Sequence, residues 1–369
     1  MSLRLAVLVH LTATRAPETM WGSNEAGRIA RQLLSNHEFG STFHDYSGLT
    51  AWLAPGYPCI VAAVFLVFGI ETRMSAVALM LLNAIFSSLT ALVACRLGTL
   101  VFNRATGLAA GWAWAISPMA ALLPFLIWDT CLSTLVLAWA ILNWVSARSA
   151  KDWVRSGLVC GLGGLINPAL LAPLPFLLAF SWWRDRNLKI CAYVLLACGM
   201  LLLPWSVRNT VVFHRVIPIR SNFWAEVYFG NVSFSLHPLG NSMEYQHRGE
   251  VAFVDTLKQS VVTHIRSNPA RFVGETLDRA LLFWIVPSSW MALTIPLATG
   301  TLCGLRLAIR NTGNRSLPLL LPLLTYPLIY FISYVYSRYR HPIEPLMYIF
   351  TAYAACEGIA TLRKSRVTT

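Results

Sequence analysis

Seven long stretches of the sequence contain no Asp, Glu, Lys or Arg, and this feature restricts the chain to membrane-spanning folds. At about 1.5 Å of helix per residue, each stretch crosses a hydrocarbon core of ~30 Å, or nearly does. Of the 369 residues, 56% are hydrophobic and 12% are charged, whereas soluble proteins carry roughly 25% charged residues. We therefore predict an all-α polytopic membrane protein with about ten transmembrane helices. The stretches are residues 75–95, 105–128, 130–147, 156–183, 190–207, 280–305 and 316–337.

The net charge of +13 raises the question of nucleic acid as a partner. A nucleic-acid surface needs basic residues gathered on one folded face, whereas here they form short clusters between apolar runs. Such clusters mark cytoplasmic loops, so we expect no nucleic-acid partner and a plasma-membrane location. The clusters are Arg96 with Arg104; Arg148, Lys151 and Arg155; Arg184, Arg186 and Lys189; Arg306, Arg310 and Arg315; and Arg363, Lys364 and Arg366.

Two interrupted apolar segments decide which side each loop occupies. Pro55, Gly56 and Pro58 leave only Cys59 to Ile70 unbroken, which is too short to span and predicts an interfacial or re-entrant helix. The run from Ser156 to Trp183 must instead cross twice and break near Asn167 and Pro168, because otherwise its flanking basic clusters lie on opposite faces. The expected spans are 74–95, 106–127, 130–147, 154–167, 169–183, 190–207, 280–302, 316–336 and 343–362.

The chain is expected to have three parts. A transmembrane core, 1–207, contains a first outer loop, 15–73; a large outer loop, 208–279, follows; and 280–369 forms the last spans. The stretch from Leu3 to Thr14 predicts a first span that is short or truncated. In the large loop we expect one amphipathic helix and a second that begins at Asn268 and Pro269; the apolar stripe of the first is Val254, Leu257, Val261 and Ile265.

Two acids at the outer ends of the spans are candidate catalytic residues. Glu25 begins a predicted helix after Ser23 or Asn24, and Asp129 stands alone between two apolar spans. Each also has a structural interpretation, since Glu25 can complement the helix dipole or pair with Arg28, and Asp129 can cap the next helix. Two carboxylates on one face are what acid–base chemistry requires.

Basic residues on the same predicted face are candidates for anion binding. Arg208 leaves the membrane in PWSVRN, where snorkelling is the alternative explanation, and Arg338, Arg340 and His341 crowd the segment YSRYRHPIEPL. Arg338, Arg340 and His341 would lie on the outer side, whereas basic residues usually gather on the cytoplasmic side. Their presence there therefore favours a bound anion.

Metal and nucleotide signals are weak. The histidines and acids of the first loop match no metal-ligand spacing; they are His37, Glu38, His44 and Asp45. Phosphate-loop and dinucleotide motifs are absent, and the glycines of the 156–183 run suit close helix packing instead; these are Gly157, Gly161, Gly163 and Gly164.

The order of several short motifs resembles the GT-C glycosyltransferases of family 39, which include the dolichyl-phosphate-mannose-protein mannosyltransferases. An acid followed by RIARQLL, a PGYP turn and a VFLVFG half-helix open the chain. Four motifs follow in order: the dipeptide Trp128–Asp129 before a span, PWSVRN, YFGN and RYRHPIEPL. The resemblance covers nearly the whole chain and implies a GT-C-like bundle.

The resemblance also implies a reaction. A sugar would move from a polyprenyl-phosphate carrier to a glycan, lipid or protein acceptor at the extracytoplasmic face. Glu25 occupies the position of the family's catalytic base and Asp129 that of its second acid. The carrier phosphate is expected to meet cationic residues, namely Arg28, Arg208, Arg338, Arg340 and His341. A divalent metal is possible, although Asn24 stands where many relatives have Asp, which puts metal dependence in question.

Two other functions remain open at this stage. A lipid or polysaccharide transporter also needs broken helices and an aqueous cavity, but the sequence has no inverted repeat. A non-catalytic membrane scaffold is the third, and it predicts that Glu25 and Asp129 lie far apart with no cavity between them.

Overall fold

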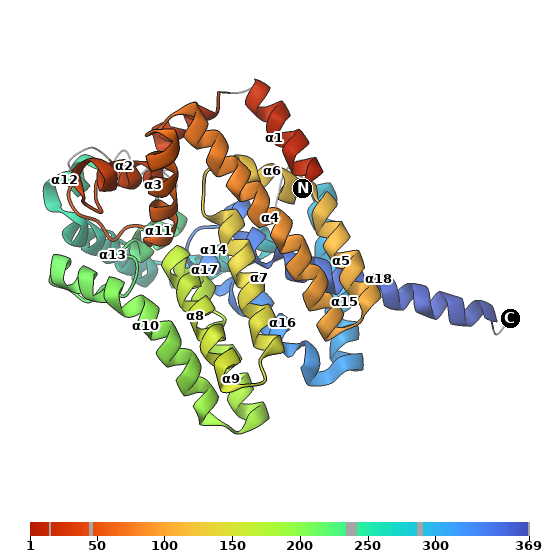
Figure 1. Cartoon of the computed structure of the whole chain (residues 1–369). Helices are drawn as coiled ribbons and strands as arrows, with labels where there is room; N and C mark the ends of the chain where they lie inside the picture. The colour runs from red at the N-terminus through yellow and green to blue at the C-terminus, as the bar shows by residue number, and fades with distance from the viewer. Residues whose placement is uncertain (15, 44–46, 234–241, 286–290, 368–369) are drawn as a thin grey trace.

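A computed structural model of the chain describes residues 1–14, 16–43, 47–233, 242–285 and 291–367. Within these residues the fold is helical, and the strand-like pairing is limited to one isolated bridge between Gly40 and Leu49. The predicted all-α class is confirmed. Figure 1 shows the long helices α4, α7, α8 and α10 side by side, with α11, α12 and α13 at one end.

The helices before the large loop, 208–279, mostly coincide with the apolar stretches of the sequence. Short 3₁₀ turns, η1, η2 and η3, join some of them. They are α1 Ser2–Thr14, η1 Pro17–Ser23, α2 Glu25–Asn36, α3 Gly56–Phe68, α4 Arg73–Val101, α5 Arg104–Ile116, α6 Pro118–Leu122, η2 Leu123–Phe125, α7 Thr130–Ser146, α8 Ala150–Ile166, η3 Pro168–Leu171, α9 Leu174–Asp185 and α10 Leu188–Phe213.

The remaining helices build the second loop region and the C-terminal part of the bundle. They are α11 Phe223–Asn231, α12 Ser242–Arg248, α13 Glu250–Ser267, α14 Pro269–Trp284, α15 Met291–Thr312, η5 Gly313–Ser316, α16 Leu317–Thr325, α17 Leu328–Ile332, η6 Ser337–Ile343 and α18 Glu344–Val367.

Both predicted interruptions are present. The expected short helix is α3, which begins earlier than predicted, at Gly56, and therefore includes Pro58. Its 13 residues are about 20 Å long, which is too short to span. The run 156–183 breaks at Asn167, whose side chain caps η3 before α9 begins. In the large loop, 208–279, three residues of the expected stripe, Val254, Leu257 and Val261, are buried in α13, whereas Ile265 is partly exposed. The next helix begins at Pro269, as predicted.

Among the expected spans, 106–127, 280–302 and 316–336 are not single helices in the structure, and the last of them is divided between α16 and α17. The span 106–127 bends by 52° between α5 and α6, because Pro118 has no N–H to continue the helix and the Ser117 hydroxyl caps the new one. The span 280–302 is also wrong as a single helix, since α14 ends at Trp284 and α15 begins at Met291. Residues 286–290, which the predicted span also covers, lie outside the described residues.

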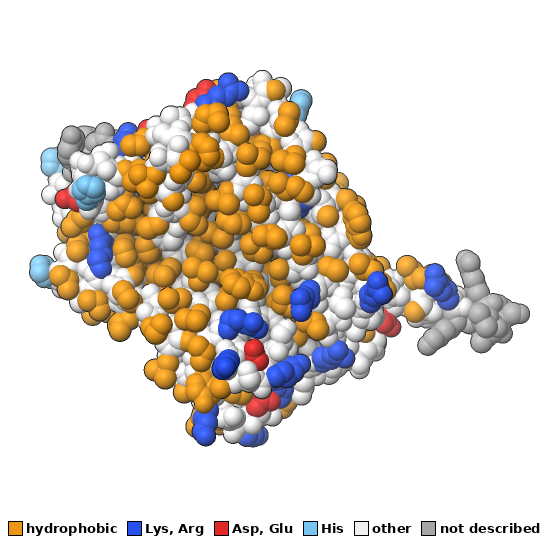
Figure 2. All heavy atoms as spheres, in the orientation of Figure 1, with side chains coloured by type: hydrophobic (Ala, Val, Ile, Leu, Met, Phe, Trp, Pro, Cys, Tyr) orange, Lys and Arg blue, Asp and Glu red, His pale blue; other side chains and the backbone are white. Residues whose placement is uncertain are grey.

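Within the described residues, three helical stretches are long and apolar enough to cross a membrane alone. These three stretches are Arg73–Val101, Leu188–Phe213 and Met291–Ile332. The bent pair α5 and α6 adds a fourth if the two helices count as one span. The predicted number of about ten therefore stays a prediction. Figure 2 shows a broad, almost continuous hydrophobic face with Lys and Arg gathered at its lower end, near α9. Leu196 of α10 is 74% exposed on the outside of the bundle, which suits lipid as its surroundings.

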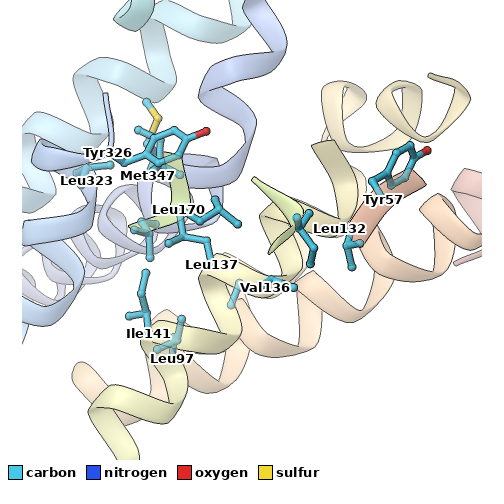
Figure 3. Packing of buried hydrophobic residues seen from close by; sticks show 14 of the residues in the cluster. Tyr57, Leu97, Leu132, Val136, Leu137, Ile141, Leu170, Leu323, Tyr326 and Met347 are labelled. Atoms are coloured by element: carbon cyan, nitrogen blue, oxygen red, sulfur yellow. The ribbon is translucent and has the colours of Figure 1, made fainter. Parts of the chain in front are cut away.

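The core of the bundle unites helices far apart in the sequence. Figure 3 shows Leu97 of α4, Ile141 of α7, Leu323 of α16 and Met347 of α18 in one buried cluster. In a membrane, such packing relies on close contact rather than on exclusion of water. Gly157 fits this principle, because a Cβ there would lie 2.4 Å from the Val194 carbonyl oxygen of α10. The glycines of α8 serve packing, as the sequence indicated.

The two loop regions, 15–73 and 208–279, pack against each other. Trp52 and Phe253 belong to one aromatic cluster. The buried Glu250 carboxylate accepts hydrogen bonds from the backbone N–H of Ala51 at 2.9 Å and from the Thr50 hydroxyl. These contacts fix the first loop region over the end of the bundle, where the candidate site lies.

Candidate functional site

A cavity of about 780 Å³ lies where the two loop regions meet the ends of α7, α8 and α17. Glu25, Arg28, Asp129 and Arg338, four of the residues singled out in the sequence, line it. The rest of the wall is mostly aromatic and aliphatic, with a few polar groups. A mostly apolar pocket of this size with a few polar groups is typical of binding sites for organic ligands.

Glu25 enters the cavity from the first turn of α2. The helix begins there because the Asn24 side chain accepts a hydrogen bond from Gly27 N–H at 2.8 Å. The Asn24 amide also donates to the Ile127 carbonyl oxygen at 2.8 Å. One buried asparagine therefore fixes the first acid relative to the segment that carries Asp129.

A further acid of the cavity, Glu226 of α11, lies near enough to Glu25 to affect its ionisation. Burial raises the pKa of the Glu25 carboxyl to about 7, and nearby Arg220 and Arg338 oppose the increase while Glu226 adds to it. Burial also raises the pKa of Glu226, again against the two arginines. Carboxyls with raised pKa values beside cations in a cavity are typical of acid–base sites.

Asp129 stands at the start of α7, at the cap position, but its side chain caps nothing. Its Oδ2 atom instead accepts hydrogen bonds from the Ser133 hydroxyl at 3.0 Å and from the Asn167 amide at 3.1 Å. Asn167 is the residue at which the run 156–183 breaks, so the interruption of α8 and α9 supplies a partner for the second acid. The capping explanation for Asp129 is wrong.

Arg338 of η6 is held by aromatic rings. Its guanidinium carbon lies 4.1 Å from the centroid of Trp128 and 5.2 Å from that of Tyr336. Cation–π contacts orient a guanidinium and leave its N–H groups able to meet an anion. Arg220 lines the same cavity and donates through Nε to the Trp52 carbonyl oxygen at 3.0 Å.

The other predicted cationic residues do not line the cavity. Arg208 donates to the carbonyl oxygens of Thr50 at 2.7 Å and Phe39 at 3.1 Å and lies over the Trp205 ring. It therefore fastens the first loop region to the end of α10. This arrangement also differs from simple snorkelling, because the guanidinium has fixed protein partners.

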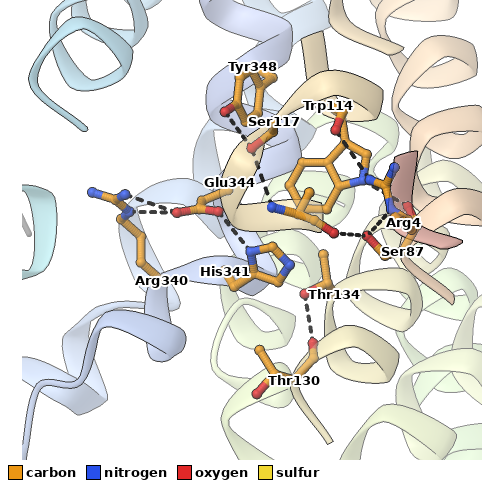
Figure 4. A network of polar contacts seen from close by, with 11 residues as sticks. Arg4, Ser87, Trp114, Ser117, Thr130, Thr134, Arg340, His341, Glu344 and Tyr348 are labelled. Atoms are coloured by element: carbon orange, nitrogen blue, oxygen red, sulfur yellow. Dashed lines mark hydrogen bonds and ion pairs between the residues drawn. The ribbon is translucent and has the colours of Figure 1, made fainter. Parts of the chain in front are cut away.

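Arg340 and His341 form a buried cluster with Glu344, the first residue of α18. Figure 4 shows both side chains directed at this carboxylate. Arg340 donates to Glu344 Oε1 at 2.9 and 3.0 Å and to the Trp284 carbonyl oxygen at 2.7 Å. His341 Nδ1 lies 2.8 Å from Glu344 Oε2. All three are at most 1% exposed, so we leave Arg340 and His341 out of the donor site.

The residues suspected of metal binding give no support to a metal centre. His37 and Glu38 are exposed at the end of α2, and His44 and Asp45 lie outside the described residues. Among the residues that the structure describes, no three His, Cys, Asp or Glu side chains converge as a metal ion needs. Asn24, where an acid was expected from the resemblance, is used as a helix cap. We assign no step to a metal.

The sequence did not single out several polar residues as members of the cavity, among them Asn167, Arg220 and Glu226. Arg220 and Glu226 lie in the second loop region, where the apolar pattern of the membrane spans gives no guidance. A signal was present nearby, because Glu226 lies two positions before Tyr228, the first residue of the motif YFGN. In that motif Asn231 donates to the Ile332 carbonyl oxygen at 3.1 Å and ties α11 to α17.

Gly230 of the same motif yields a stability prediction. A Cβ at this position would lie 1.9 Å from the Ser333 carbonyl oxygen, so Gly230→Ala must push α11 from α17. We expect the melting temperature in detergent to fall, by the equivalent of about 1–3 kcal/mol for such overpacking. Gly274→Ala on α14 is the control, because a Cβ there meets no atom within 4 Å. Equal melting temperatures for the two variants would contradict the close packing of α11.

Comparisons with known proteins show which structures share the fold of this chain. No protein-family model and no curated protein sequence matches the chain. In fold it is similar to ArnT from Cupriavidus metallidurans bound to undecaprenyl phosphate, with a TM-score of 0.57 and 14% identity over 94% of this chain and 59% of that one.

It is also similar to the oligosaccharyltransferase AglB from Archaeoglobus fulgidus in complex with an inhibitory peptide and a dolichol-phosphate. The TM-score is 0.55, with 13% identity over 95% of this chain and 47% of that one. The chain thus spans about half the length of the structures it matches. The chain therefore shares its overall helical fold with these two membrane enzymes. At these identities the likeness establishes the fold, and the chemistry has to be argued from the cavity.

Proposed function

We propose that the protein is a GT-C glycosyltransferase of the family 39 type. It moves a sugar from a polyprenyl-phosphate carrier to a hydroxyl of a glycan, lipid or protein acceptor at the extracytoplasmic face of the plasma membrane. The observation that carries the proposal is a single cavity lined by Glu25, Asp129, Arg220, Glu226 and Arg338. Carboxylates and guanidinium groups around one mostly apolar cavity suit a substrate with hydroxyls, a phosphate and a lipid tail.

Each step of the transfer has a group suited to it. Glu25 accepts the proton of the acceptor hydroxyl as the oxygen attacks the anomeric carbon of the sugar. The bond from that carbon to the phosphate oxygen breaks, and the polyprenyl phosphate leaves with the bonding electrons. Arg338, with Arg220 and Arg28 on the same wall, stabilises the charge that develops on this phosphate. Asp129, held by Ser133 and Asn167, orients a hydroxyl of the sugar.

The dimensions of the cavity are consistent with this substrate. A volume of about 780 Å³ accommodates a sugar phosphate and the beginning of a lipid chain within the range of known ligand pockets. Stacked tyrosines line one side, with the rings of Tyr330 and Tyr339 4.8 Å apart. Aromatic faces offer apolar area for the sugar ring and the isoprene units.

Loss of the Arg338 charge tests whether the cavity binds the carrier. We expect Arg338→Gln to weaken binding of undecaprenyl phosphate about tenfold or more, because a charge-assisted contact to the phosphate is lost. Native mass spectrometry of the purified chain with added undecaprenyl phosphate measures this affinity directly.

Arg271→Gln is the matched control for Arg338→Gln. It removes the same charge from α14, where Arg271 is exposed and paired only with Glu275 at 2.7 Å within the described residues. If undecaprenyl phosphate binds the Arg338→Gln and Arg271→Gln variants with the same affinity, the assignment of Arg338 is refuted. Failure of the unmodified chain to bind any polyprenyl phosphate would refute the proposed donor.

A further inference from the structure

A second cavity, of about 460 Å³, lies away from the candidate site, where α4, α7 and α9 end and η5 begins. Four of the residues lining it are arginines, and we call it the arginine pocket. Its wall is completed by apolar and small polar side chains. The lining residues are Arg96, Leu100, Val145, Ser146, Arg148, Arg184, Asn314, Arg315 and Pro318.

The arginine pocket and the candidate site lie at opposite ends of the bundle. Helix α7 shows this directly, because Thr130 and Ser133 at its start line the first cavity, whereas Val145 and Ser146 at its end line the second. The helix has 17 residues, about 25 Å of length. The pocket therefore faces the leaflet away from the candidate site, where the basic clusters of the sequence gather.

The charge of the arginine pocket is far from balanced. Arg184 is neutralised by Asp185, with hydrogen bonds of 2.6 and 2.8 Å, and this acid also attracts Arg148. Arg148 donates to the carbonyl oxygens of Val145 and Ala147, and Arg315 to that of Leu100. Carbonyl contacts orient a guanidinium without cancelling its charge.

Another acid near Arg148, Asp152, does not correct this imbalance. Asp152 accepts hydrogen bonds from Ser149 and from the backbone N–H of Arg148, and pairs with Arg155 at 3.6 Å. Within the described residues, Arg96 and Arg315 have no acidic partner within ion-pair distance. Across the part of the chain that the structure describes, the pocket thus gathers more positive charge than the neighbouring acids balance.

The surroundings of the arginine pocket favour a lipid. Its wall includes Leu100, Val145 and Pro318 beside the guanidinium groups. Trp182 and Trp183, directly before Arg184, are 44% and 49% exposed, and exposed tryptophans are typical of the depth at which lipid headgroups lie. Basic pockets between transmembrane helices at this level bind phosphate headgroups.

We infer that the arginine pocket binds the phosphate of an anionic membrane phospholipid, at the end of the bundle opposite the candidate site. Guanidinium groups match phosphate oxygens in geometry and charge. The acyl chains would extend from the pocket along the hydrophobic outer face. Such a lipid would bridge the ends of α4, α7, α9 and η5.

The test compares two double variants of the full chain purified in detergent. Arg96→Gln/Arg315→Gln removes two charges of the pocket and keeps the Arg184–Asp185 pair. Arg306→Gln/Arg310→Gln removes two exposed charges of α15 outside the pocket. Native mass spectrometry with phosphatidylglycerol or phosphatidylcholine gives the affinity of each form, and thermal unfolding shows that each form is folded.

We expect phosphatidylglycerol to bind the unmodified chain and the α15 variant in preference to phosphatidylcholine. Binding to the pocket variant should be about tenfold weaker or more, given the contribution of each basic residue to anionic lipid binding. Equal losses in both double variants would overturn the proposal, because general charge then explains the binding. Complete displacement of the lipid by millimolar inorganic phosphate would also overturn it, since the ligand is then a free anion.

Discussion

Glu25→Gln is expected to reduce sugar transfer about 100-fold or more, the usual contribution of a positioned general base. Glutamine keeps the size and the hydrogen-bonding capacity of the side chain but cannot accept the proton of the acceptor hydroxyl. The measurement is incorporation of labelled sugar in membranes supplied with polyprenyl-phosphate sugars. Glu38→Gln, an exposed position just beyond α2, is the matched control and should retain full transfer.

The pH profile of the unmodified protein checks the same assignment independently. The base works only when deprotonated, and burial raises the pKa of Glu25 to about 7. Transfer should therefore increase with pH up to about 7, level off above it, and fall about tenfold for each pH unit well below it. A Glu25→Gln variant with full transfer, or a profile flat from pH 5 to 8, would contradict the role of Glu25.

Arg340→Met is expected to prevent stable folding rather than to weaken donor binding. The substitution leaves the Glu344 carboxylate, 1% exposed, without its principal cation and removes the hydrogen bond to the Trp284 carbonyl oxygen. Removal of one partner of a buried ion pair costs about 3–5 kcal/mol. The melting temperature in detergent and the yield of monodisperse protein measure the effect.

A double variant separates a structural role of Arg340 from a functional one. Arg340→Met/Glu344→Met removes both charges, so it should recover most of the lost stability. Arg306→Met, an exposed position of α15, controls for loss of an arginine. Normal stability of Arg340→Met together with lost undecaprenyl phosphate binding would contradict our structural interpretation and restore Arg340 to the donor site.

The sequence singled out two acids that line the cavity, but it did not separate the arginines that line the cavity from those that are buried elsewhere. Glu25 and Asp129 stand out because an isolated acid beside an apolar span is costly and therefore conspicuous. Arg338 and Arg340 are two positions apart and equally conspicuous, yet one lines the cavity and the other is buried against Glu344. Spacing along η6 does not reveal which way each side chain points, because this depends on the helices packed against it.

Local sequence determined the membrane character of the chain, the short helix α3, the break at Asn167 and the start of α2 at Asn24. These features depend on apolar length, proline and capping, which act over a few residues. The cavity depended on tertiary structure. Asn167, Arg220 and Glu226 belong to segments far from Glu25 in sequence, and only the packing of the two loop regions over the bundle brings them together. Ionisation of Glu25 is set by the same packing, since burial and the neighbouring charges raise its pKa.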